Sequence, residues 1–113
     1  YSGSDQTDAL RALNFINEHY AEPLTLDTMA NHFHMNASYF SSYFKKNTGK
    51  NFKEFLISVR LQHALQLLVS TNMHNYEIAD AVGFNDIRSF TDQFQKAYGK
   101  TPQAYRKELR QEV

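Results

Sequence analysis

The feature of this sequence that most restricts its fold is an internal repeat. The segment MANHFHMNASYFSSYFKKNTGKNFKEF resembles a later segment, IADAVGFNDIRSFTDQFQKAYGKTPQAY. At a spacing of 50 residues the matched positions include Phe40 with Phe90, Phe44 with Phe94, and Gly49-Lys50 with Gly99-Lys100. Upstream the spacing is 49, which pairs Ala30 with Ala79, so the copies differ in length by one residue inside a turn. The chain is therefore expected to fold as two copies of one small unit.

The local pattern within the repeat is helical. Only four Gly and two Pro interrupt the 113 residues, and no segment alternates apolar and polar residues as a strand does. Apolar stripes and capping residues predict seven helices, over about residues 5–20, 26–33, 36–47, 51–69, 76–82, 85–98 and 101–110. The predicted capping residues are Thr25, Asn36, Asn51, Asn85 and Thr101. Residues 1–4 look like a linker, and we exclude them from the predicted fold.

Each copy contains the parts of a helix-turn-helix unit, in which a small residue lets two helices cross closely. The second copy supplies Ala79, the turn glycine Gly83, the cap Asn85 and the inner stripe Phe90 and Phe94. The first copy supplies Ala30, Asn36, Phe40, Tyr43 and Phe44. His34 stands where the turn glycine is expected, and His tolerates a positive φ better than branched residues do.

The predicted fold class is all-α, with two homeodomain-like helix-turn-helix subdomains joined by a long linker helix. The first subdomain covers residues 5–50, the linker helix 51–70 and the second subdomain 71–111, as one compact domain overall. If the linker helix is rigid, it holds the second helices of the two units about one DNA turn apart, roughly 34 Å.

The outer face of the second helix in each unit is polar. Residues at positions i, i+3, i+4 and i+7, opposite the phenylalanines, are Ser38, Ser41, Ser42 and Lys45 in one copy and Arg88, Thr91, Asp92 and Gln95 in the other. Lysines flank both faces, at Lys46, Lys50, Lys53, Lys96 and Lys100. Such faces are typical of helices that read base edges in a major groove, although most polar helix faces are simply solvated.

Net charge is zero, which is unusual for a nucleic-acid binder, but the charges are unevenly distributed. The first 34 residues carry one Arg against five Asp and Glu, whereas the rest carry eleven Lys and Arg against seven Asp and Glu. Charges beyond about 10 Å are largely screened at ordinary salt, so the local field near the polar faces matters most.

Several function classes find no support in the sequence. The absence of Cys excludes thiol catalysis and Cys-based metal sites, and it suits a reducing compartment. The five His are scattered, and no zinc-protease signature, phosphate loop or nucleophile motif is present. No apolar run is long enough for a membrane span. We expect neither catalysis nor a cofactor or metal, and the alternative to DNA binding is a helical protein-interaction module without direct DNA readout.

The segment GFNDIRSFTDQFQKAYGKTPQAYRK closely resembles the C-terminal signature of the AraC/XylS family of bacterial transcription regulators. The shared features are the Gly-Phe pair, two Phe four residues apart, the following Gly and the element T-P-x-x-Y-R. The first half is similar through LTLDTMA and YFSSYFKKNTGKNFKEFL, so the resemblance covers about residues 8–110. It implies seven helices and two recognition helices that enter successive major-groove segments of promoter or operator DNA.

The resemblance also implies roles for individual positions. Base-facing positions are Ser38, Ser41, Ser42 and Lys45 in the first unit, and Ile87, Arg88, Thr91, Asp92 and Gln95 in the second. The positions assigned to the DNA backbone are Asn36, Lys46, Lys50, Asn85, Lys96 and Lys100. Family members place this domain after an effector or dimerisation domain, contact RNA polymerase and work in the cytoplasm. The chain departs from the family at Asn75, where an apolar residue is usual, and at Asp92.

Specificity is expected to come mainly from the second unit. Arg88 is the best candidate for a bidentate contact to guanine, and Gln95 reads adenine or binds phosphate. Asp92 either accepts from cytosine N4 or pairs with Arg88 four residues away, and the pairing is favoured because an unpaired carboxylate is repelled by phosphates. Arg60 and Arg110, at equivalent places in the copies, are expected to be structural. The serine-rich helix is expected to read shape more than bases.

Overall fold

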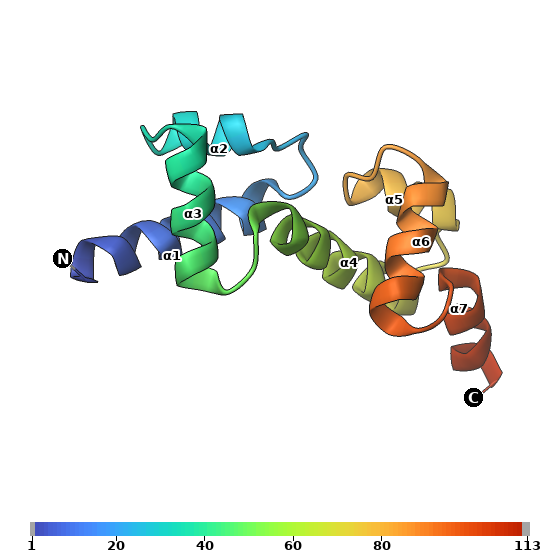
Figure 1. Ribbon diagram of the computed structural model, residues 1–113. Coiled ribbons are helices and arrows are strands. Elements are labelled where there is room, and N and C mark those ends of the chain that lie inside the picture. The colour runs from blue at the N-terminus through green and yellow to red at the C-terminus, as the bar shows by residue number, and fades with distance from the viewer. Residues whose placement is uncertain (1, 112–113) are drawn as a thin grey trace. The chain divides into compact units, whose positions relative to one another are not determined.

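The computed structural model describes the backbone of residues 2–111 and the side chains of residues 7–110. This part of the chain is all-α, as predicted (Figure 1). Its seven helices are α1 (Ser2–His19), α2 (Leu26–His32), α3 (Ala37–Thr48), α4 (Phe52–Ser70), α5 (Asn75–Ala81), α6 (Ile87–Tyr98) and α7 (Pro102–Gln111). None of them is long and apolar enough to cross a membrane.

Residues form two compact units, and the boundary between them falls inside α4, between Val59 and Arg60. The first unit contains α1, α2, α3 and the start of α4, and the second contains the rest of α4 with α5, α6 and α7. The two crossing helices of each unit begin and end at equivalent residues. Helices α3 and α6 both have 12 residues and lie 50 positions apart, and α2 and α5 both have seven residues and lie 49 positions apart. The repeat seen in the sequence is thus a repeat of structure.

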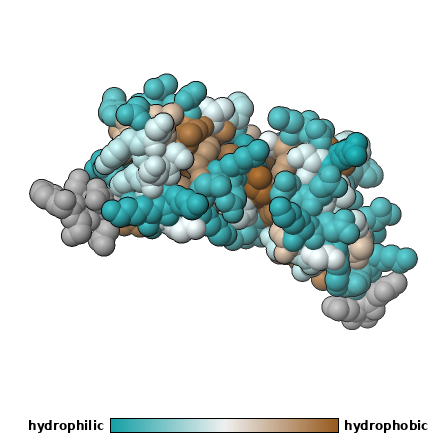
Figure 2. Space-filling model, viewed as in Figure 1, coloured by the Kyte–Doolittle hydropathy of each residue, from teal (hydrophilic) through white to brown (hydrophobic). Residues whose placement is uncertain are grey.

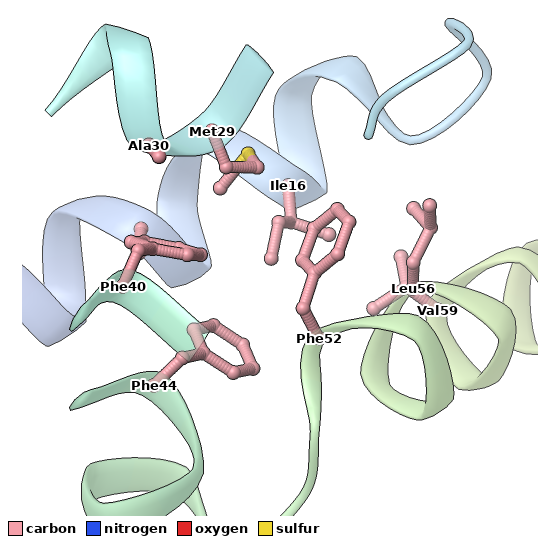
Figure 3. Close-up of a cluster of buried hydrophobic side chains, with 9 residues drawn as sticks. Ile16, Met29, Ala30, Phe40, Phe44, Phe52, Leu56 and Val59 are labelled. Carbon is pink, nitrogen blue, oxygen red and sulfur yellow. The ribbon is translucent and has the colours of Figure 1, made fainter. Parts of the chain in front are cut away.

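The core of the first unit forms around the inner face of α3. Phe40 and Phe44 are fully buried, and their ring centroids lie 5.7 Å apart. They face Met29 and Ala30 of α2, Ile16 of α1, and the start of α4 (Figure 3). Ala30 is 2% exposed, so the small side chain predicted for the helix crossing is buried between α2 and α3. Close packing of this kind leaves little room for a larger residue at that point.

The second unit repeats this arrangement with different side chains. Phe90 and Phe94 are again fully buried, with centroids 5.8 Å apart, and Ile78 and Ala79 of α5 take the places of Met29 and Ala30. Phe94 also contacts Tyr105 of α7, edge to face at 6.0 Å. Helix α6 is therefore held by aromatic contacts on the side of its phenylalanines, while Arg88, Asp92 and Gln95 on the opposite side are exposed.

The turn between the two crossing helices has the same geometry in both units. His34 has φ of 57° and Gly83 has φ of 101°, so both adopt positive φ, as predicted for His34. After each of them the chain folds back, and the Met35 and Phe84 amides donate to the Ala30 and Ala79 carbonyls at 2.9 Å. His34 pays a conformational cost that glycine does not, because Cβ crowds the backbone in this region.

Four of the five predicted caps are confirmed, and one is wrong. The side chains of Thr25, Asn36, Asn51 and Thr101 accept from the backbone amide three residues on, at 2.8–3.1 Å. At α6, however, the cap is Asp86, whose Oδ1 accepts from the Ser89 amide at 2.6 Å. Asn85 is the extra residue by which the second copy exceeds the first, so it lies in the turn and outside the helix.

Two helix starts also differ from expectation. α1 begins at Ser2, so the exclusion of residues 2–4 from the fold was wrong, while Tyr1 lies outside the described residues. α5 begins at Asn75, one residue before the predicted start, because Glu77 Oε1 accepts from the His74 amide at 2.9 Å and closes the first turn. A polar residue at position 75 therefore does not delay the helix.

The end of α4 is held by an arginine that the sequence analysis quoted but gave no role. Arg106 of α7 donates from Nη1 to the Met73 carbonyl at 2.6 Å, and from Nη2 to the Leu68 and Thr71 carbonyls at 3.3 and 3.4 Å. A helix leaves its last carbonyls without partners inside the helix, and a cation there also complements the helix dipole. Arg106 thus ties α7 to the chain that connects α4 with α5.

We expect Arg106→Leu to lower the free energy of unfolding by about 2 kcal/mol, because hydrogen bonds from a charged donor are strong and their loss leaves carbonyls unpaired. Leucine is the residue at the equivalent position of the first unit, Leu56. Urea denaturation followed by circular dichroism measures the change. Lys107→Met, at the exposed neighbouring position, is the control and should shift stability by less than about 0.5 kcal/mol. Equal effects of the two substitutions would contradict the role given to Arg106.

The corrected cap of α6 can be tested in the same assay. Asp86→Ala removes the acceptor for the Ser89 amide and should lower the free energy of unfolding by about 1 kcal/mol. Asn85→Ala should have an effect of less than about 0.5 kcal/mol, since Asn85 precedes the cap. A larger loss for Asn85→Ala than for Asp86→Ala would restore the assignment made from the sequence.

Candidate nucleic-acid interface

The surface of α6 combines long polar side chains with a rigid support. Arg88, Asp92 and Gln95 are exposed on the side opposite the buried phenylalanines, and Thr91 is half-buried between them. Ile87, at the first position of the helix, is 42% exposed. The visible surface around α6 is mostly hydrophilic (Figure 2). All five positions predicted to face bases on α6 thus have at least part of their side chain at the surface.

The surface of α3 has the same register but shorter groups. Ser38, Ser42 and Lys45 are exposed, and Ser41 is half-buried at the position equivalent to Thr91. Hydroxyls on such short side chains extend little beyond the helix surface. At the positions equivalent to the exposed serines, the side chains of α6 therefore extend further from the helix than those of α3.

Tyr39 is a surface residue of α3 that the sequence analysis missed. The residue is 55% exposed, and its ring stacks on that of Tyr43 at a centroid distance of 6.2 Å, with 12° between the ring planes. The equivalent residue of α6 is Ser89. Because Tyr39 directly follows Ser38 and its hydroxyl can donate and accept, it adds a long polar group beside the serines. The sequence could have indicated this residue, because Tyr39 stands beside Ser38 at an outward position of the first copy of the repeat.

The predicted ion pair between Arg88 and Asp92 is not formed. Within the described part of the chain, the structure gives no ion pair between these two side chains, although they are four residues apart on α6. Both groups are exposed, and a surface pair at this spacing contributes only a few tenths of a kcal/mol, about 0.3–0.5. Water can therefore compete with the pairing in the free protein.

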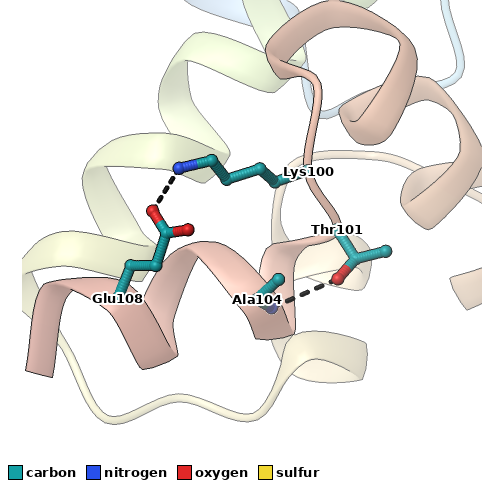
Figure 4. A network of polar contacts seen from close by, with 4 residues as sticks. All are labelled: Lys100, Thr101, Ala104 and Glu108. Carbon is teal, nitrogen blue, oxygen red and sulfur yellow. Dashed lines mark hydrogen bonds and ion pairs between the residues drawn. The ribbon is translucent and has the colours of Figure 1, made fainter. Parts of the chain in front are cut away.

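The lysines assigned to phosphates differ in their surroundings. Lys46, Lys50 and Lys96 are exposed, and Lys46 and Lys96 lie in the last turns of their helices, as does Lys45, which was assigned to bases. Lys100 instead forms an ion pair with Glu108 of α7 (Figure 4). Its ammonium group already has an anionic partner, and phosphate contact would compete with that pair. The same view shows Thr101 capping α7 through the Ala104 amide.

The two asparagines assigned to the DNA backbone also differ. Asn36 is exposed, and its Oδ1 accepts from the Tyr39 amide, which leaves the Nδ2 donors for an acceptor such as a phosphate oxygen. Asn85 is exposed in the turn before α6, next to the cap Asp86. Both side chains lie at the amino end of a recognition helix, where the positive end of the helix dipole favours an anion.

The arginines at equivalent ends of the repeat are not equivalent in burial. Arg60 is half-buried, and burial lowers its pKa from the ordinary value. Arg110 is exposed on α7. The structural role expected for Arg60 is consistent with its burial, whereas the exposed side chain of Arg110 is free to meet a partner from outside the unit.

Comparison with known proteins identifies the family. A helix-turn-helix domain family matches residues 29–108. The chain is 34% identical over 104 residues to an uncharacterized HTH-type transcriptional regulator, YobQ, from Bacillus subtilis strain 168, covering 92% of this chain and 43% of that protein. The chain spans less than half the length of this and other curated relatives.

Solved structures give the same result. The C-terminal domain of the two-component response regulator yesN from Fusobacterium nucleatum is 38% identical, with a TM-score of 0.81 over 84% of this chain and 93% of that one. The DNA-binding domain of AdpA, a global transcriptional factor solved in complex with a target DNA, is 26% identical, with a TM-score of 0.88 over 92% of this chain and 94% of that one. The chain belongs to the AraC/XylS family of helix-turn-helix transcription regulators and is a DNA-binding domain of that family.

Proposed function

We propose that this domain recognises its DNA site mainly through α6, while α3 contributes close approach and shape readout. The observation that carries the proposal is the contrast between two faces in the same register. α6 exposes Arg88, Asp92 and Gln95, whereas α3 exposes Ser38 and Ser42. Direct readout in the major groove needs donors and acceptors that reach base edges, and a long side chain reaches further than a serine hydroxyl.

Arg88 is the proposed reader of guanine. It is exposed in the first turn of α6, and the buried phenylalanines on the opposite side fix the rotation of the helix about its axis. A guanidinium group can donate two parallel hydrogen bonds to guanine O6 and N7. The missing ion pair with Asp92 leaves both donor edges of Arg88 available when the helix enters the groove.

The two units are proposed to occupy successive major-groove segments, with centres about 34 Å apart, so that one chain reads a bipartite site. The likeness to the AdpA domain, which was solved with its target DNA, supports this arrangement. Exposed lysines, above all Lys46 and Lys96, are proposed to contact phosphates on either side of the recognition helices.

We further propose that the domain is the C-terminal part of a longer bacterial regulator, with an effector or dimerisation domain before it and RNA polymerase as a partner at the promoter. The lengths of the curated relatives support this, as do two solved relatives described as C-terminal domains of response regulators. A protein that binds promoter DNA in a bacterium acts where the chromosome is, in the cytoplasm.

A binding selection on randomised duplex DNA tests the proposal as a whole. We expect an enriched site with two halves about one helical turn apart, of which the half bound by the second unit is the more sharply defined. Affinity for the selected site should fall steeply with salt. Failure to enrich any sequence, together with binding that salt does not weaken, would instead favour a module that binds other proteins.

Base reading by Arg88 predicts a position-specific loss. Arg88→Ala should remove about 1–3 kcal/mol of discrimination at a single base pair of the selected site and leave the preference at other positions unchanged. Ser38→Ala, in the same register of α3, is the matched control and should change discrimination by less than about 0.5 kcal/mol. Competition binding with singly substituted sites measures both, and uniform weakening by Arg88→Ala across all sites would refute the reading role.

Phosphate contact by Lys96 predicts a change in salt dependence. Lys96→Gln should reduce the slope of log affinity against log salt by about one unit, since one fewer counterion is released. Lys100→Gln should change the slope less, because the Lys100 ammonium group is paired with Glu108. Fluorescence anisotropy at several salt concentrations measures the slopes. If the two variants have equal slopes, the distinction drawn from the ion pair is wrong.

A further inference from the structure

A pocket of about 500 Å³ opens on the second unit, between the start of α5 and one face of α7. It is lined by six residues, namely His74, Asn75, Gln103, Arg106, Lys107 and Arg110. The four residues from α7 follow a helical spacing, so they form one continuous stripe along that helix. None of them is among the positions assigned to DNA bases or to the DNA backbone.

The lining is strongly cationic. It contains three side chains that carry positive charge at neutral pH, Arg106, Lys107 and Arg110, and it contains no Asp or Glu. Burial, and next the nearby charge of Arg110, lower the pKa of Arg106. The charges in this pocket therefore repel one another. Such a group of charges is stabilised by an anion, because each arginine and lysine donor then gains an acceptor of opposite charge.

One of the residues that line this pocket, Asn75, has a buried polar atom without a partner. Oδ1 of Asn75 is buried and has no hydrogen-bond partner. Buried polar atoms without partners are uncommon, since each loses its water without a replacement. Rotation of the amide by half a turn exchanges Oδ1 for Nδ2 and presents a donor where the acceptor stood. In one orientation the Asn75 amide can therefore donate to a ligand rich in acceptors, and in the other it can accept from a ligand that also carries a hydroxyl.

The first unit shows that the fold does not require these polar residues. The positions equivalent to Asn75, Arg106 and Lys107 are occupied there by Leu26, Leu56 and Ile57. Leu56 is 5% exposed, and Leu26 packs against the same core cluster. In one copy these positions hold apolar side chains, and in the other they line an open, cationic pocket. The hydrogen bonds of Arg106 to the end of α4 give a structural reason for a polar residue at position 106. They give no such reason for the polar residues Asn75 and Lys107.

We propose that this pocket binds a phosphate group. A phosphate has tetrahedral acceptor oxygens and up to two negative charges, which suits donors that approach from two helices, whereas a carboxylate has two oxygens in one plane. The volume exceeds that of one phosphate ion, so the pocket has room for a phosphate group attached to a larger molecule. That molecule is either a phosphorylated metabolite or the DNA backbone, and the chemistry at the pocket is the same. The inference goes beyond the proposed DNA readout and does not depend on it.

The first test uses the whole chain without DNA and inorganic phosphate as the probe. Two-dimensional ¹H–¹⁵N spectra are recorded during titration, with ionic strength held constant by sodium chloride. We expect saturable shifts of the Gln103 and Asn75 side-chain amide signals, with a dissociation constant on the order of millimolar. Arg110→Gln should weaken binding several-fold, while Arg11→Gln, which removes the same charge from an exposed position of α1, should leave it unchanged.

A second variant protects the test against loss of fold. Asn75→Leu restores the residue of the first unit and removes the orphaned atom, so it should fold at least as stably as the parent chain. It should nevertheless reduce phosphate binding, because an apolar side chain would then occupy part of the pocket. The shifts of the Gln103 amide report this loss.

The source of the phosphate is distinguished with the selected duplex. If the pocket holds a backbone phosphate, DNA displaces inorganic phosphate, and Arg110→Gln lowers the salt slope of DNA binding by about one unit. If it holds a phosphorylated metabolite, the DNA-bound protein still binds phosphate, glucose 6-phosphate binds more tightly than phosphate, and the salt slope is unchanged. Failure of DNA binding in the selection leaves the first titration untouched, so the two proposals fail separately.

Two results would overturn the inference. One is a linear drift of the amide signals with phosphate that equals the drift with sodium chloride, which would mean that the pocket has no site for the ion. The other is saturable binding of glutamate, or of an acidic peptide, with no preference for phosphate. That outcome would assign the pocket to carboxylates of a protein partner.

Discussion

The arrangement of each unit depends on two phenylalanines that are four residues apart and fully buried. Phe40 and Phe44 in α3, and Phe90 and Phe94 in α6, have no exposed surface. Burying side chains at i and i+4 fixes the rotation of a helix about its own axis, so the opposite side is necessarily exposed. The alanine of the preceding helix and the positive φ of His34 or Gly83 let the two helices approach closely enough for this packing. What each unit presents to DNA is therefore decided by what it buries.

The repeat allows the two units of one molecule to be compared position by position, because they share a backbone geometry and differ in their side chains. On the outer faces of α3 and α6 the difference is reach, with serines in one copy and Arg88, Asp92 and Gln95 in the other. At the junction of α7 with α5 the difference is polarity, since Leu26, Leu56 and Ile57 give way to a cationic set. Both changes place polar chemistry in the second unit. The first unit keeps the scaffold but presents shorter side chains on the outer face of its second helix.

What could be predicted from the sequence was mostly local. Helices, turns and four caps follow from residues within four positions of one another, and the repeat tested each assignment twice. The error at α6 arose because Asn85 and Asp86 are both good caps, and the extra residue of the second copy shifted the choice by one. The three hydrogen bonds of Arg106 were missed because their partners lie 33 to 38 residues away in the sequence. Its side chain could have been assigned to solvent, to phosphate or to the core with equal justification.

Zero net charge does not conflict with DNA binding once the places of the acidic residues are known. Asp27, Glu54 and Glu77 lie in the first turns of their helices, and Asp86 caps α6. At these positions a carboxylate meets the positive end of the helix dipole, and at Asp86 it also accepts an amide proton. Lys45, Lys46 and Lys96 occupy last turns instead, and their long side chains remain exposed. The charges of these four carboxylates are thus partly neutralised by the backbone, while the three lysines project into solvent. Salt largely screens charges of either sign beyond about 10 Å. A phosphate near α3 or α6 is therefore attracted by the lysines around it, and the net charge of the chain has little effect on it.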